Sequence, residues 1–485
     1  MPAAPRSLYL AAVDLGATSG RVILGSWKNR RLELREVHRF PNAFRSLGTH
    51  DYWDVPGLWA QIQAGLRAAA AALPKGATLA SVGVDCWGVD HVLLDRSGRL
   101  VFPTHAYRDA RTQPGLKKLA RNRADLGRIY AATGIPNVFY NTSLQLAETV
   151  ASQPWLVEAV DRCLFLPDYF NHLLGGRAAN ELTIASTSQL LSVRGRAWSA
   201  EAFGFFGVPA KWFGRPVAPG TDLGGVKSSD TLGGIALAGT RVIAVPGHDT
   251  ACAYDAMPAA PEGGDLFLSS GTWSLVGFES QKPLLGAGAL AARVANERTG
   301  DGGYRPLTNV IGLWLLEGVM KDFASRPETP EAWAALIATA EALPAPGGFL
   351  DVADPVFTSP SSMKAAIDGH LAKRGLARPG DLAGYTRLIC DSLGRGHAEA
   401  MRRFETMARR KFQRILIVGG GSRNRLLCQA TADAAGVPVV SFALEGTAVG
   451  NLARQLIALG AVSDLAAFRE LLGRRLEQTV YAPRG

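Results

Sequence analysis

Cysteine, histidine and long apolar runs are scarce in this sequence of 485 residues. The eight histidines form no cluster with the spacing of metal ligands, and no CxxC pair occurs among the dispersed cysteines Cys86, Cys163, Cys252, Cys390 and Cys428. This distribution excludes a disulfide framework and a zinc site, and it is typical of reduced thiols. No apolar run approaches the length that a membrane-spanning helix requires, and the stretch 8–13 runs into Asp14 rather than into a cleavage site. We therefore predict a cytoplasmic protein with no membrane partner.

Charged residues are also few, at 19%, while hydrophobic residues reach 47%, which excludes a disordered chain and a fibrous repeat. The net charge of +10 raises the question of a nucleic-acid partner. The basic residues are spread along the chain, and neither an aromatic-interleaved basic stretch nor a nucleic-acid motif accompanies them. We therefore predict a solvated surface and no nucleic-acid partner, although a positive field would help attract an anionic nucleotide.

The length predicts two domains, because one core rarely organises so many residues. Each half opens with a strand, a turn rich in glycine and hydroxyl groups, and a returning strand, first over 8–27 and again over 265–278. A helix is predicted after Asp54, which can cap it, because Leu58, Ile62 and Leu66 recur at helical spacing, and an amphipathic helix is predicted over about 382–408. Prolines and paired glycines interrupt the pattern near 257–264. We predict duplicated α/β domains, 1–257 and 258–485, that face each other across a cleft.

The first motif is Asp14-Leu-Gly-Ala-Thr-Ser-Gly-Arg21, a turn between two apolar strands. Backbone N–H groups converge there with no bulky side chain to block approach, so the turn can cradle a phosphate. It lacks the Gly-Lys-Ser/Thr of a Walker A loop. Asp14 ends a buried strand, where a carboxylate is costly unless it serves a metal or a donor. The alternative is a tight hairpin in which Thr18 and Ser19 bond their own backbone.

A second motif, Gly247-His248-Asp249-Thr250, follows the apolar strand 241–245. This places Asp249 at the carboxyl end of a strand, where open α/β sheets bind ligands. A carboxylate there can accept the proton of a sugar hydroxyl as the hydroxyl attacks a phosphorus atom. The alternative is that Asp249 or Thr250 merely caps a helix.

Three more segments are candidates for ligand contacts. Ser269–Ser274 is the second-half counterpart of the first turn and could grip a phosphate; as an ordinary hairpin it would bury Trp273 in the core. Gly419-Gly420-Gly421 would let a nucleotide lie against bare backbone, and Ser422 is expected to cap the following helix. Trp87-Gly88 offers a flat face and an opening for a sugar ring, although a tryptophan at a strand end is more often part of the core.

Together these motifs resemble the FGGY carbohydrate kinases, which are actin-like ATPases of the ribonuclease-H fold. The resemblance covers about residues 9–459 and is most specific to the kinases of L-rhamnulose. It rests on the segments VDLGATSGR (13–21), VDCWGVDHVLLD (84–95), YRDART (107–112), LPDYF (166–170), LSSGTWSLVGFES (268–280), NVIGLWLL (309–316) and VGGGSRN (418–424).

The resemblance implies that ATP phosphorylates L-rhamnulose to L-rhamnulose 1-phosphate, with Asp249 as the proton acceptor. The residues implied to contact ATP are Ala17, Thr18, Ser19, Gly20, Arg21, Thr272, Glu317 and Gly420. Those implied to contact the sugar are Gly88, His248, Asp249, Thr250 and Asn309. Mg²⁺ would be held by Asp14 through water. Glu317 departs from the Gln often found in relatives, so it needs a cation or a proton if it faces ATP.

Two other functions stay open at this point. The same chemistry could act on another sugar, such as L-fuculose or a ketopentose, because pocket shape decides between them. A sugar-independent, actin-like ATPase would need no sugar pocket, and Trp87 and Asp249 would then be incidental.

Overall fold

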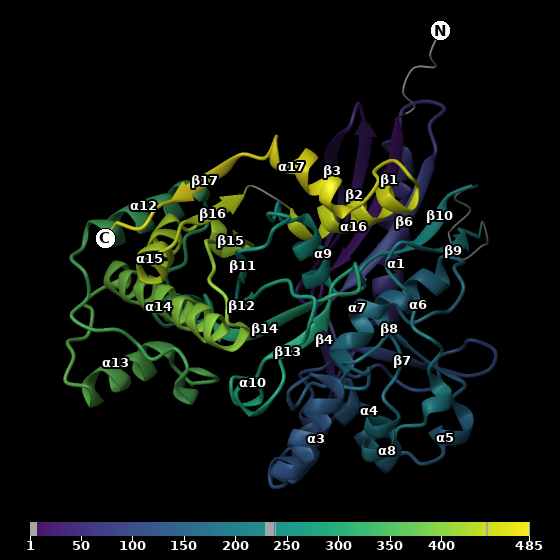
Figure 1. The fold of residues 1–485 in the computed structure, drawn as a ribbon, viewed down its shortest axis with the longest axis horizontal. Coiled ribbons are helices and arrows are strands. Elements are labelled where there is room, and N and C mark those ends of the chain that lie inside the picture. The colour runs from purple at the N-terminus through teal and green to yellow at the C-terminus, as the bar shows by residue number, and fades with distance from the viewer. Residues whose placement is uncertain (1–6, 228–236, 238, 443–444, 485) are drawn as a thin grey trace. The chain divides into compact units, whose positions relative to one another are not determined.

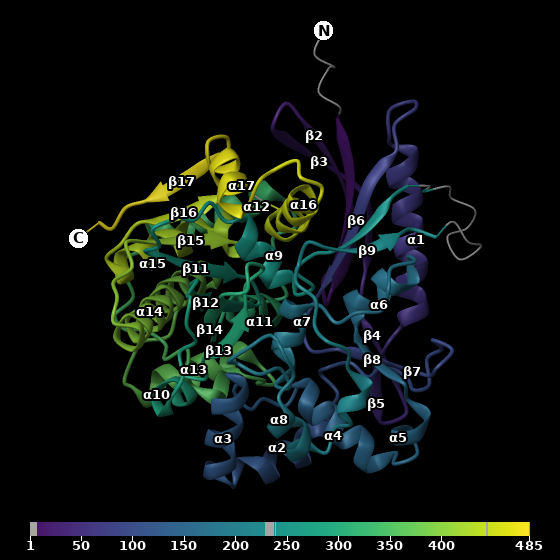
Figure 2. The ribbon, with the colours of Figure 1, turned by 45° about the vertical axis from the view of Figure 1, so that its right-hand side comes forward.

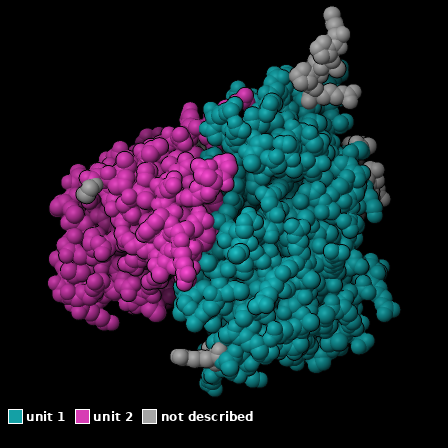
Figure 3. Space-filling view, in the orientation of Figure 1, with its two compact units in different colours: residues 1–258, 279–306, 446–474 teal, residues 259–278, 307–445, 475–485 magenta. Residues whose placement is uncertain are grey.

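The computed structural model describes residues 7–227, 237, 239–442 and 445–484 (Figure 1). Contacts between residues divide the chain into two compact units, coloured in Figure 3. Unit 1 comprises Met1–Pro258, Glu279–Pro306 and Gly446–Arg474, and unit 2 comprises Ala259–Phe278, Leu307–Glu445 and Arg475–Gly485. The domain division between residues 257 and 258 stays a prediction. None of the helices in the described part of the chain combines the length and apolarity that crossing a bilayer requires.

The first sheet has the strand order β3-β2-β1-β6-β10-β9. β1 pairs antiparallel with β2 and parallel with β6, and β10 pairs parallel with β6 and antiparallel with β9. Its strands are β1 (Leu8–Leu15), β2 (Ser19–Lys28), β3 (Arg31–Pro41), β6 (Leu79–Cys86), β9 (Thr221–Gly225) and β10 (Arg241–Ala244). The central strands β1 and β6 are almost wholly buried, as expected for strands covered on both faces.

The second sheet has the order β13-β14-β12-β11-β15-β16-β17 and repeats this pairing pattern. β11 pairs antiparallel with β12 and parallel with β15, just as β1 pairs with β2 and β6. The strands are β11 (Asp265–Ser270), β12 (Trp273–Gly277), β13 (Ala295–Arg298), β14 (Tyr304–Ile311), β15 (Arg414–Val418), β16 (Val439–Phe442) and β17 (Gln478–Tyr481). The repeat of a three-strand meander followed by parallel strands agrees with the predicted duplication.

Helix α1 (Val55–Ala71) shows how the sequence determines a local element. Asp54 caps it by accepting a hydrogen bond from Gly57 N at 2.9 Å, and Pro56 lies in its first turn. Leu58, Ile62 and Leu66 are buried, and the helix packs against β2 and β3. Figure 2 shows α1 alongside the first sheet. The predicted cap and apolar spacing are therefore confirmed.

Two further helices position the candidate site of unit 1. α9 (Asp249–Ala256) follows β10, and α16 (Gly446–Ala458) packs against α9, β1 and β6. α14 (Leu382–Ala408) covers β12 in unit 2 and matches its predicted range. The other α-helices are α2 (Gln113–Ala120), α3 (Arg123–Thr133), α4 (Thr142–Ser152), α5 (Leu156–Ala159), α6 (Leu166–Leu173), α7 (Leu182–Ala185), α8 (Ala200–Phe206), α10 (Ala287–Ala291), α11 (Trp314–Asp322), α12 (Pro330–Ala342), α13 (Met363–Lys373), α15 (Arg425–Ala435) and α17 (Leu465–Gly473).

Three local expectations differ from the structure. Ser422 does not cap α15: its hydroxyl donates to Gly419 O at 2.7 Å, and Asn424 caps the helix instead. Trp273 is not in the core, because 41% of it is exposed. Two separate antiparallel pairs of short strands were not predicted: β4 (Phe44–Leu47) with β5 (His50–Trp53), and β7 (His91–Leu94) with β8 (Arg162–Phe165).

Candidate functional site

The turn between β1 and β2 is compact and held from one side. Gly16 N donates to Ser19 O at 2.9 Å, and the side chain of Asn42 donates to Gly16 O at 2.8 Å. Thr18 is exposed at the tip, and Ala17 and Ser19 are half-buried. Gly20 is buried, and a Cβ there would lie 2.2 Å from the Phe40 ring. Residues 16–20 of the turn thus have small side chains or none, as a phosphate cradle requires.

Asp14 and Arg21 are direct cross-strand partners in β1 and β2. Arg21 Nε donates to Asp14 Oδ2 at 2.9 Å, and Arg21 Nη2 lies 2.7 Å from the same oxygen. The side chains are 18% and 8% exposed, so this ion pair is shielded from water. The buried Asp14 carboxylate thus has a cationic partner, which offsets the free-energy cost of burying its charge.

Asp85 lies beside Asp14, because the two residues are in register on the parallel strands β6 and β1. Its Oδ2 accepts a hydrogen bond from Asn451 at 2.6 Å, whereas its buried Oδ1 has no hydrogen-bond partner in the described structure. Burial raises the pKa of Asp85 well above its usual value, and the charges of Asp14 and Asp249 raise it further, against the effect of Asn451. Three carboxyl groups therefore share one electrostatic environment, and the sequence analysis gave Asp85 no role.

The loop that delivers Asp249 is fixed by a buried carboxylate. Glu181 Oε2 accepts from Gly247 N at 2.8 Å and from Ile184 N at 3.0 Å. A Cβ on Gly247 would lie 2.9 Å from the Ile184 side chain, so the loop sits tightly against α7. Gly247 O also accepts from Cys86 N at 2.9 Å, which joins the loop to the end of β6. These hydrogen bonds fix the position at which α9 begins with Asp249.

The two carboxylate oxygens of Asp249 differ in their surroundings. Oδ1 accepts from Thr250 N at 2.5 Å and from Thr250 Oγ1 at 3.0 Å, and His248 Nε2 lies 3.4 Å away. No contact to Oδ2 is present among the described residues. The Asp249 side chain is 31% exposed, so Oδ2 is accessible. A carboxylate with one anchored and one accessible oxygen suits a proton acceptor.

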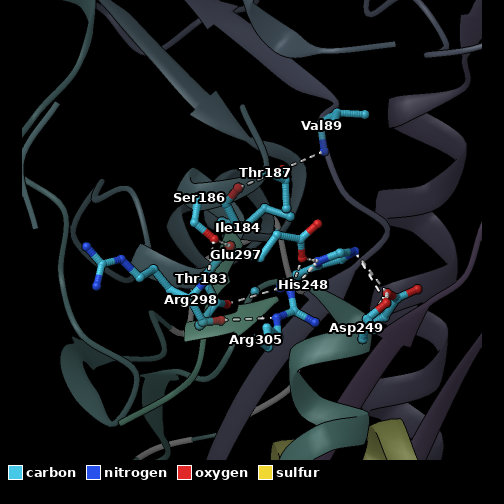
Figure 4. A network of polar contacts seen from close by, with 12 residues as sticks. Val89, Thr183, Ile184, Ser186, Thr187, His248, Asp249, Glu297, Arg298 and Arg305 are labelled. Atoms are coloured by element: carbon cyan, nitrogen blue, oxygen red, sulfur yellow. Dashed lines mark hydrogen bonds and ion pairs between the residues drawn. The ribbon is translucent and has the colours of Figure 1, made fainter. Parts of the chain in front are cut away.

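His248 lies in a buried ionic network, shown in Figure 4. Its Nδ1 is 3.0 Å from Glu297 Oε2, and Arg305 Nη2 contacts the same oxygen and lies 2.6 Å from Nδ1. Burial alone would raise the pKa of Glu297, but the charges of Arg305 and His248 outweigh it and bring the pKa to about 2. Glu297 is therefore a carboxylate at every ordinary pH.

Gly88 adjoins His248 at the end of β6. A Cβ on Gly88 would lie 3.3 Å from His248 Nε2 and 3.4 Å from Thr187 Cγ2, so the absence of a side chain leaves only a small gap beside these two residues. The next residue, Val89, has a φ of 70°, which is strained for a β-branched side chain. Thr187 accepts from Val89 N at 3.2 Å and Thr142 donates to Val89 O at 2.6 Å, which holds this conformation.

An aromatic wall lies behind Gly88. The rings of Trp53 and Trp87 are 4.2 Å apart, and both indole N–H groups donate to Asp90 Oδ2, at 2.5 and 2.8 Å. Tyr107 N and Gln145 Nε2 also donate to this buried carboxylate, each at 3.2 Å. Trp87 is 5% exposed and belongs to the core, as the alternative interpretation of the sequence held.

In unit 2, two glycine-rich turns meet beside the end of β11. A Cβ on Gly421 would lie 2.1 Å from Ser270 Oγ, and one on Gly419 would lie 2.6 Å from Ser270 O. A Cβ on Gly420 would meet nothing within 4 Å, and Gly420 and Thr272 are both exposed. The structure thus brings the predicted nucleotide contacts Thr272 and Gly420 to one surface of unit 2.

Two predicted contacts lie elsewhere in unit 2. Asn309 is an exposed residue of β14, opposite Leu275 of β12. Glu317 is in the first turn of α11 and forms an ion pair with Arg326 at 3.1 Å. Glu317, Lys321 and Arg326 line a surface pocket. Arg326 is thus a cationic neighbour of Glu317, and the contact of Glu317 with ATP stays a prediction.

Sequence reasoning did not find Glu297, Arg305 and Thr187. Glu297 lies 49 residues and Arg305 57 residues from His248, and neither belongs to a local motif. The sequence gives no signal for them, because Glu297 lies in the polar stretch 296–301 and Arg305 follows Gly302 and Gly303 without a recognisable motif. Among the described residues no group of three or more His, Cys, Asp or Glu side chains is arranged to hold a metal. A metal carried by a nucleotide and by water would need fewer protein ligands.

Comparison with known proteins finds relatives over nearly the whole chain. Residues 9–254 match the N-terminal domain of the FGGY family of carbohydrate kinases, and residues 266–459 match its C-terminal domain. A rhamnulokinase of Klebsiella pneumoniae (strain 342) is 38% identical over 479 residues, covering 98% of this chain and 94% of the relative. A rhamnulokinase of Enterobacter sp. (strain 638) is 37% identical over 479 residues, with the same coverage.

Solved structures share the fold at low sequence identity. The xylulose kinase of Rhodospirillum rubrum has a TM-score of 0.79 at 20% identity, with 99% of this chain and 94% of that chain covered. The glycerol kinase of Plasmodium falciparum with ADP also has a TM-score of 0.79, at 14% identity, with 98% and 94% covered. At these identities the likeness shows the fold alone, and it confirms the predicted two-domain α/β architecture.

Proposed function

The chain belongs to the FGGY family of carbohydrate kinases and is an ATP-dependent sugar kinase, and we propose that its acceptor is L-rhamnulose. The observation that carries the choice of sugar is the 38% identity to a rhamnulokinase over 98% of this chain. The product would be L-rhamnulose 1-phosphate, with ADP released. ATP and reduced thiols occur together in the cytoplasm, which is the compartment we propose.

Asp249 is the proton acceptor in this proposal. The 1-hydroxyl of the sugar gives its proton to Asp249 Oδ2, and its oxygen forms a bond to the γ-phosphorus of ATP while the bond from that phosphorus to the bridging oxygen breaks. The anchoring of Oδ1 by Thr250 and the accessibility of Oδ2 support this role. Because the transition state is loose, positioning and charge neutralisation supply most of the catalysis.

The sugar would contact Gly88, His248, Asp249, Thr250 and Asn309. Support comes from the space at Gly88, which adjoins His248 Nε2. The hydrogen bonds from Trp53 and Trp87 to Asp90 hold the backbone just before Gly88 in place, which supports a fixed shape at the proposed sugar contact.

The residues that would contact ATP are Ala17, Thr18, Ser19, Gly20, Arg21, Thr272, Glu317 and Gly420. The bare backbone at Gly420 supports a close approach of the nucleotide. Mg²⁺ would arrive with ATP and would neutralise phosphate charge, held by Asp14 through water. The position of Asp14 at the end of β1, beside the turn proposed to hold the phosphates, supports this assignment.

The test is an assay of ADP release with Mg·ATP and a panel of acceptors: L-rhamnulose, L-fuculose, D-xylulose, L-ribulose, D-fructose and glycerol. L-Rhamnulose should exceed the other acceptors in kcat/KM by about tenfold or more, which is the discrimination expected from a few pocket contacts. A different leading sugar would keep the enzyme class and overturn the choice of acceptor. ADP release at one rate with every acceptor would instead indicate a sugar-independent ATPase.

A further inference from the structure

Trp273 is a large apolar side chain that the structure leaves open to solvent. It is the first residue of β12, directly after Thr272, and 41% of it is exposed. By contrast, Trp53 and Trp87 are each 5% exposed, so no ligand can pack against their rings. A single exposed tryptophan needs no explanation by itself, and its surroundings decide whether it has a role.

The register of β12 and β14 places Trp273 on the same face of the second sheet as Asn309. Leu275 pairs directly with Asn309, and Trp273 lies two residues before Leu275. Side chains two apart on a strand point to the same face, and a diagonal cross-strand neighbour is within reach of an aromatic side chain. Leu275 is half-buried and Asn309 is exposed. Trp273 is therefore a neighbour of a proposed sugar contact.

The opposite face of β12 is covered by α14. Ser274, the residue between Trp273 and Leu275, is fully buried, and its Oγ lies 2.9 Å from Nε2 of His397 in α14. Successive side chains of a strand point to opposite faces of the sheet. Trp273 therefore lies on the face that is directed away from α14.

The backbone that carries Trp273 is fixed by the residues that begin α11. Leu313 N donates to Gly271 O at 2.8 Å, and Trp314 N donates to Thr272 O at 3.2 Å. Gly271 N also donates to Trp273 O at 2.9 Å, which closes the turn. A tryptophan has only two side-chain torsions, so a ring on a fixed backbone loses little conformational entropy when a ligand packs against it.

The proposed sugar contacts offer no large apolar surface. Gly88 has no side chain, and the other contacts present polar groups: His248, Asp249, Thr250 and Asn309. A ketose also carries C–H groups, and L-rhamnulose ends in a methyl group. Small-molecule sites bury such groups against apolar and aromatic side chains. Trp273 can supply this surface, because its exposed ring lies beside Asn309.

We propose that Trp273 is a further contact of the sugar, with its indole ring packed against the C–H groups and the terminal methyl group. This inference rests on the proposed function, which supplies the sugar and its contact with Asn309. It adds a rule for selection: the part of the acceptor that meets Trp273 is apolar. An acceptor with a hydroxyl group in place of the methyl group binds more weakly, because that hydroxyl loses water without gaining a partner at the ring face.

A binding experiment on labelled protein tests the contact without any turnover. The ten tryptophans are replaced by 5-fluorotryptophan, and the ¹⁹F signal of Trp273 is identified by its loss in Trp273→Phe. L-Rhamnulose is titrated with and without Mg·ADP, and calorimetry establishes the concentration that saturates the protein. We expect the Trp273 signal to shift as the sugar binds. An unmoved signal at saturating sugar overturns the proposal, and a shift with Mg·ADP alone would instead assign the ring to the nucleotide.

A kinetic experiment tests the consequence for selection. Trp273→Ala should raise the KM for L-rhamnulose about tenfold or more and change the KM for ATP less than about twofold, whereas Trp273→Phe, which keeps an aromatic face, should stay within about threefold of wild type. The ratio of kcat/KM for L-rhamnulose to that for L-ribulose, which lacks the methyl group, should fall in Trp273→Ala.

The matched control is Trp155→Ala, because Trp155 is also an exposed tryptophan, at 53%, and precedes α5. It should change neither KM. An unchanged KM for L-rhamnulose in Trp273→Ala, or equal increases in both KM values, overturns the sugar contact.

The two proposals fail in different ways. If another sugar leads the acceptor panel, the choice of L-rhamnulose fails, and the ¹⁹F titration with that sugar still decides whether Trp273 is a contact. If Trp273→Ala does not fold, the titration of the wild-type protein decides, since it needs only the phenylalanine variant for assignment. If L-rhamnulose leads and the Trp273 signal does not move, the proposed function stands and this inference falls.

Discussion

Gly450 of α16 lies directly against the backbone of Cys252 in α9. A Cβ on Gly450 would be 1.8 Å from Cys252 O, so only glycine allows this approach of the two helices. α9 begins with Asp249, and Arg454, one turn beyond Gly450, donates to Asp255 at the other end of α9. The crossing of α16 and α9 therefore fixes the position of the proposed proton acceptor.

Replacement of Gly450 should affect both stability and turnover. Gly450→Ala forces α9 and α16 apart, and overpacking of this kind costs about 1–3 kcal/mol of unfolding free energy. Because α9 moves, kcat should also fall. Gly446→Ala in the same helix is the control, since its Cβ would meet Ala253 only at 3.7 Å. Urea unfolding and steady-state assays measure both effects, and equal stability of the two variants would contradict the expectation.

Asp249→Asn tests the proton acceptor directly. The variant keeps the size of the side chain but removes the basic oxygen, so kcat should fall by about 10²–10⁴-fold, the usual contribution of a general base. ATP binding by calorimetry should stay near normal. Asp222→Asn, which removes the carboxylate of an exposed ion pair with Arg241, should leave kcat unchanged. An unchanged kcat in Asp249→Asn would remove the assignment.

Side chains of increasing size at Gly88 should act on the sugar rather than on ATP. An alanine Cβ would lie in close contact with His248 Nε2 and Thr187, so Gly88→Ala should fold normally and weaken sugar binding, and Gly88→Leu should weaken it further. Gly127→Leu is the control, because a Cβ at that position of α3 would meet no atom within 4 Å. Calorimetric titration with sugar and with ATP separates the effects. Equal losses for both ligands would count against a sugar contact.

The elements of this fold were largely predictable, because they depend on neighbours in sequence. The spacing of Leu58, Ile62 and Leu66 predicted α1, and the run 382–408 matched α14. Local rules failed where two local bonds compete, as at Ser422, whose hydroxyl turns back to Gly419 while Asn424 caps the helix. They also failed for β4 and β5, which are too short to show a clear alternation.

The site was predictable only in part, for a physical reason. His248 and Asp249 belong to a motif of adjacent residues, and Asp14 and Arg21 lie at the two ends of one turn. Glu297 and Arg305 reach His248 through the tertiary fold, in a segment where the sequence analysis assigned no chemistry. The tertiary fold determines which side chain lies beside a buried charge. Here the pairing of β13 and β14 brings Glu297 and Arg305 together, and no short motif in the sequence indicates that pairing.

The turn at Gly419–Gly421 offers a matched pair of substitutions for the nucleotide site. Gly420→Ala adds a methyl group to open space, so the variant should remain as stable as wild type and should raise the KM for ATP if the nucleotide lies against this backbone. Gly421→Ala would place its Cβ against Ser270 and should destabilise unit 2. Thermal unfolding and ATP titration distinguish the two. A normal KM for ATP in Gly420→Ala would exclude a close contact there.

The carboxyl group that holds the aromatic wall should make stability depend on pH. Burial raises the pKa of Asp90 to about 6 from its usual 3.8, against the hydrogen bonds from Trp87, Trp53, Gln145 and Tyr107 N. Below pH 3.8 both the folded and the unfolded chain hold this proton. Between pH 3.8 and about 6 the unfolded chain loses it first, so the contribution of Asp90 to the unfolding free energy falls as pH rises. The total change is about 3 kcal/mol at most, since each pKa unit corresponds to about 1.4 kcal/mol.

Asp90→Asn removes this titration. The unfolding free energy of wild type minus that of the variant should therefore decrease between about pH 4 and pH 6 and should be constant above about pH 7. Other titrating groups cancel in the difference. The variant also carries a constant penalty, because an amide nitrogen in place of one oxygen would face Gln145 Nε2 or the indole donors. Urea unfolding of both proteins at a series of pH values measures the difference, and a difference that rises with pH would show that Asp90 is ionised more readily in the folded state than in the unfolded chain.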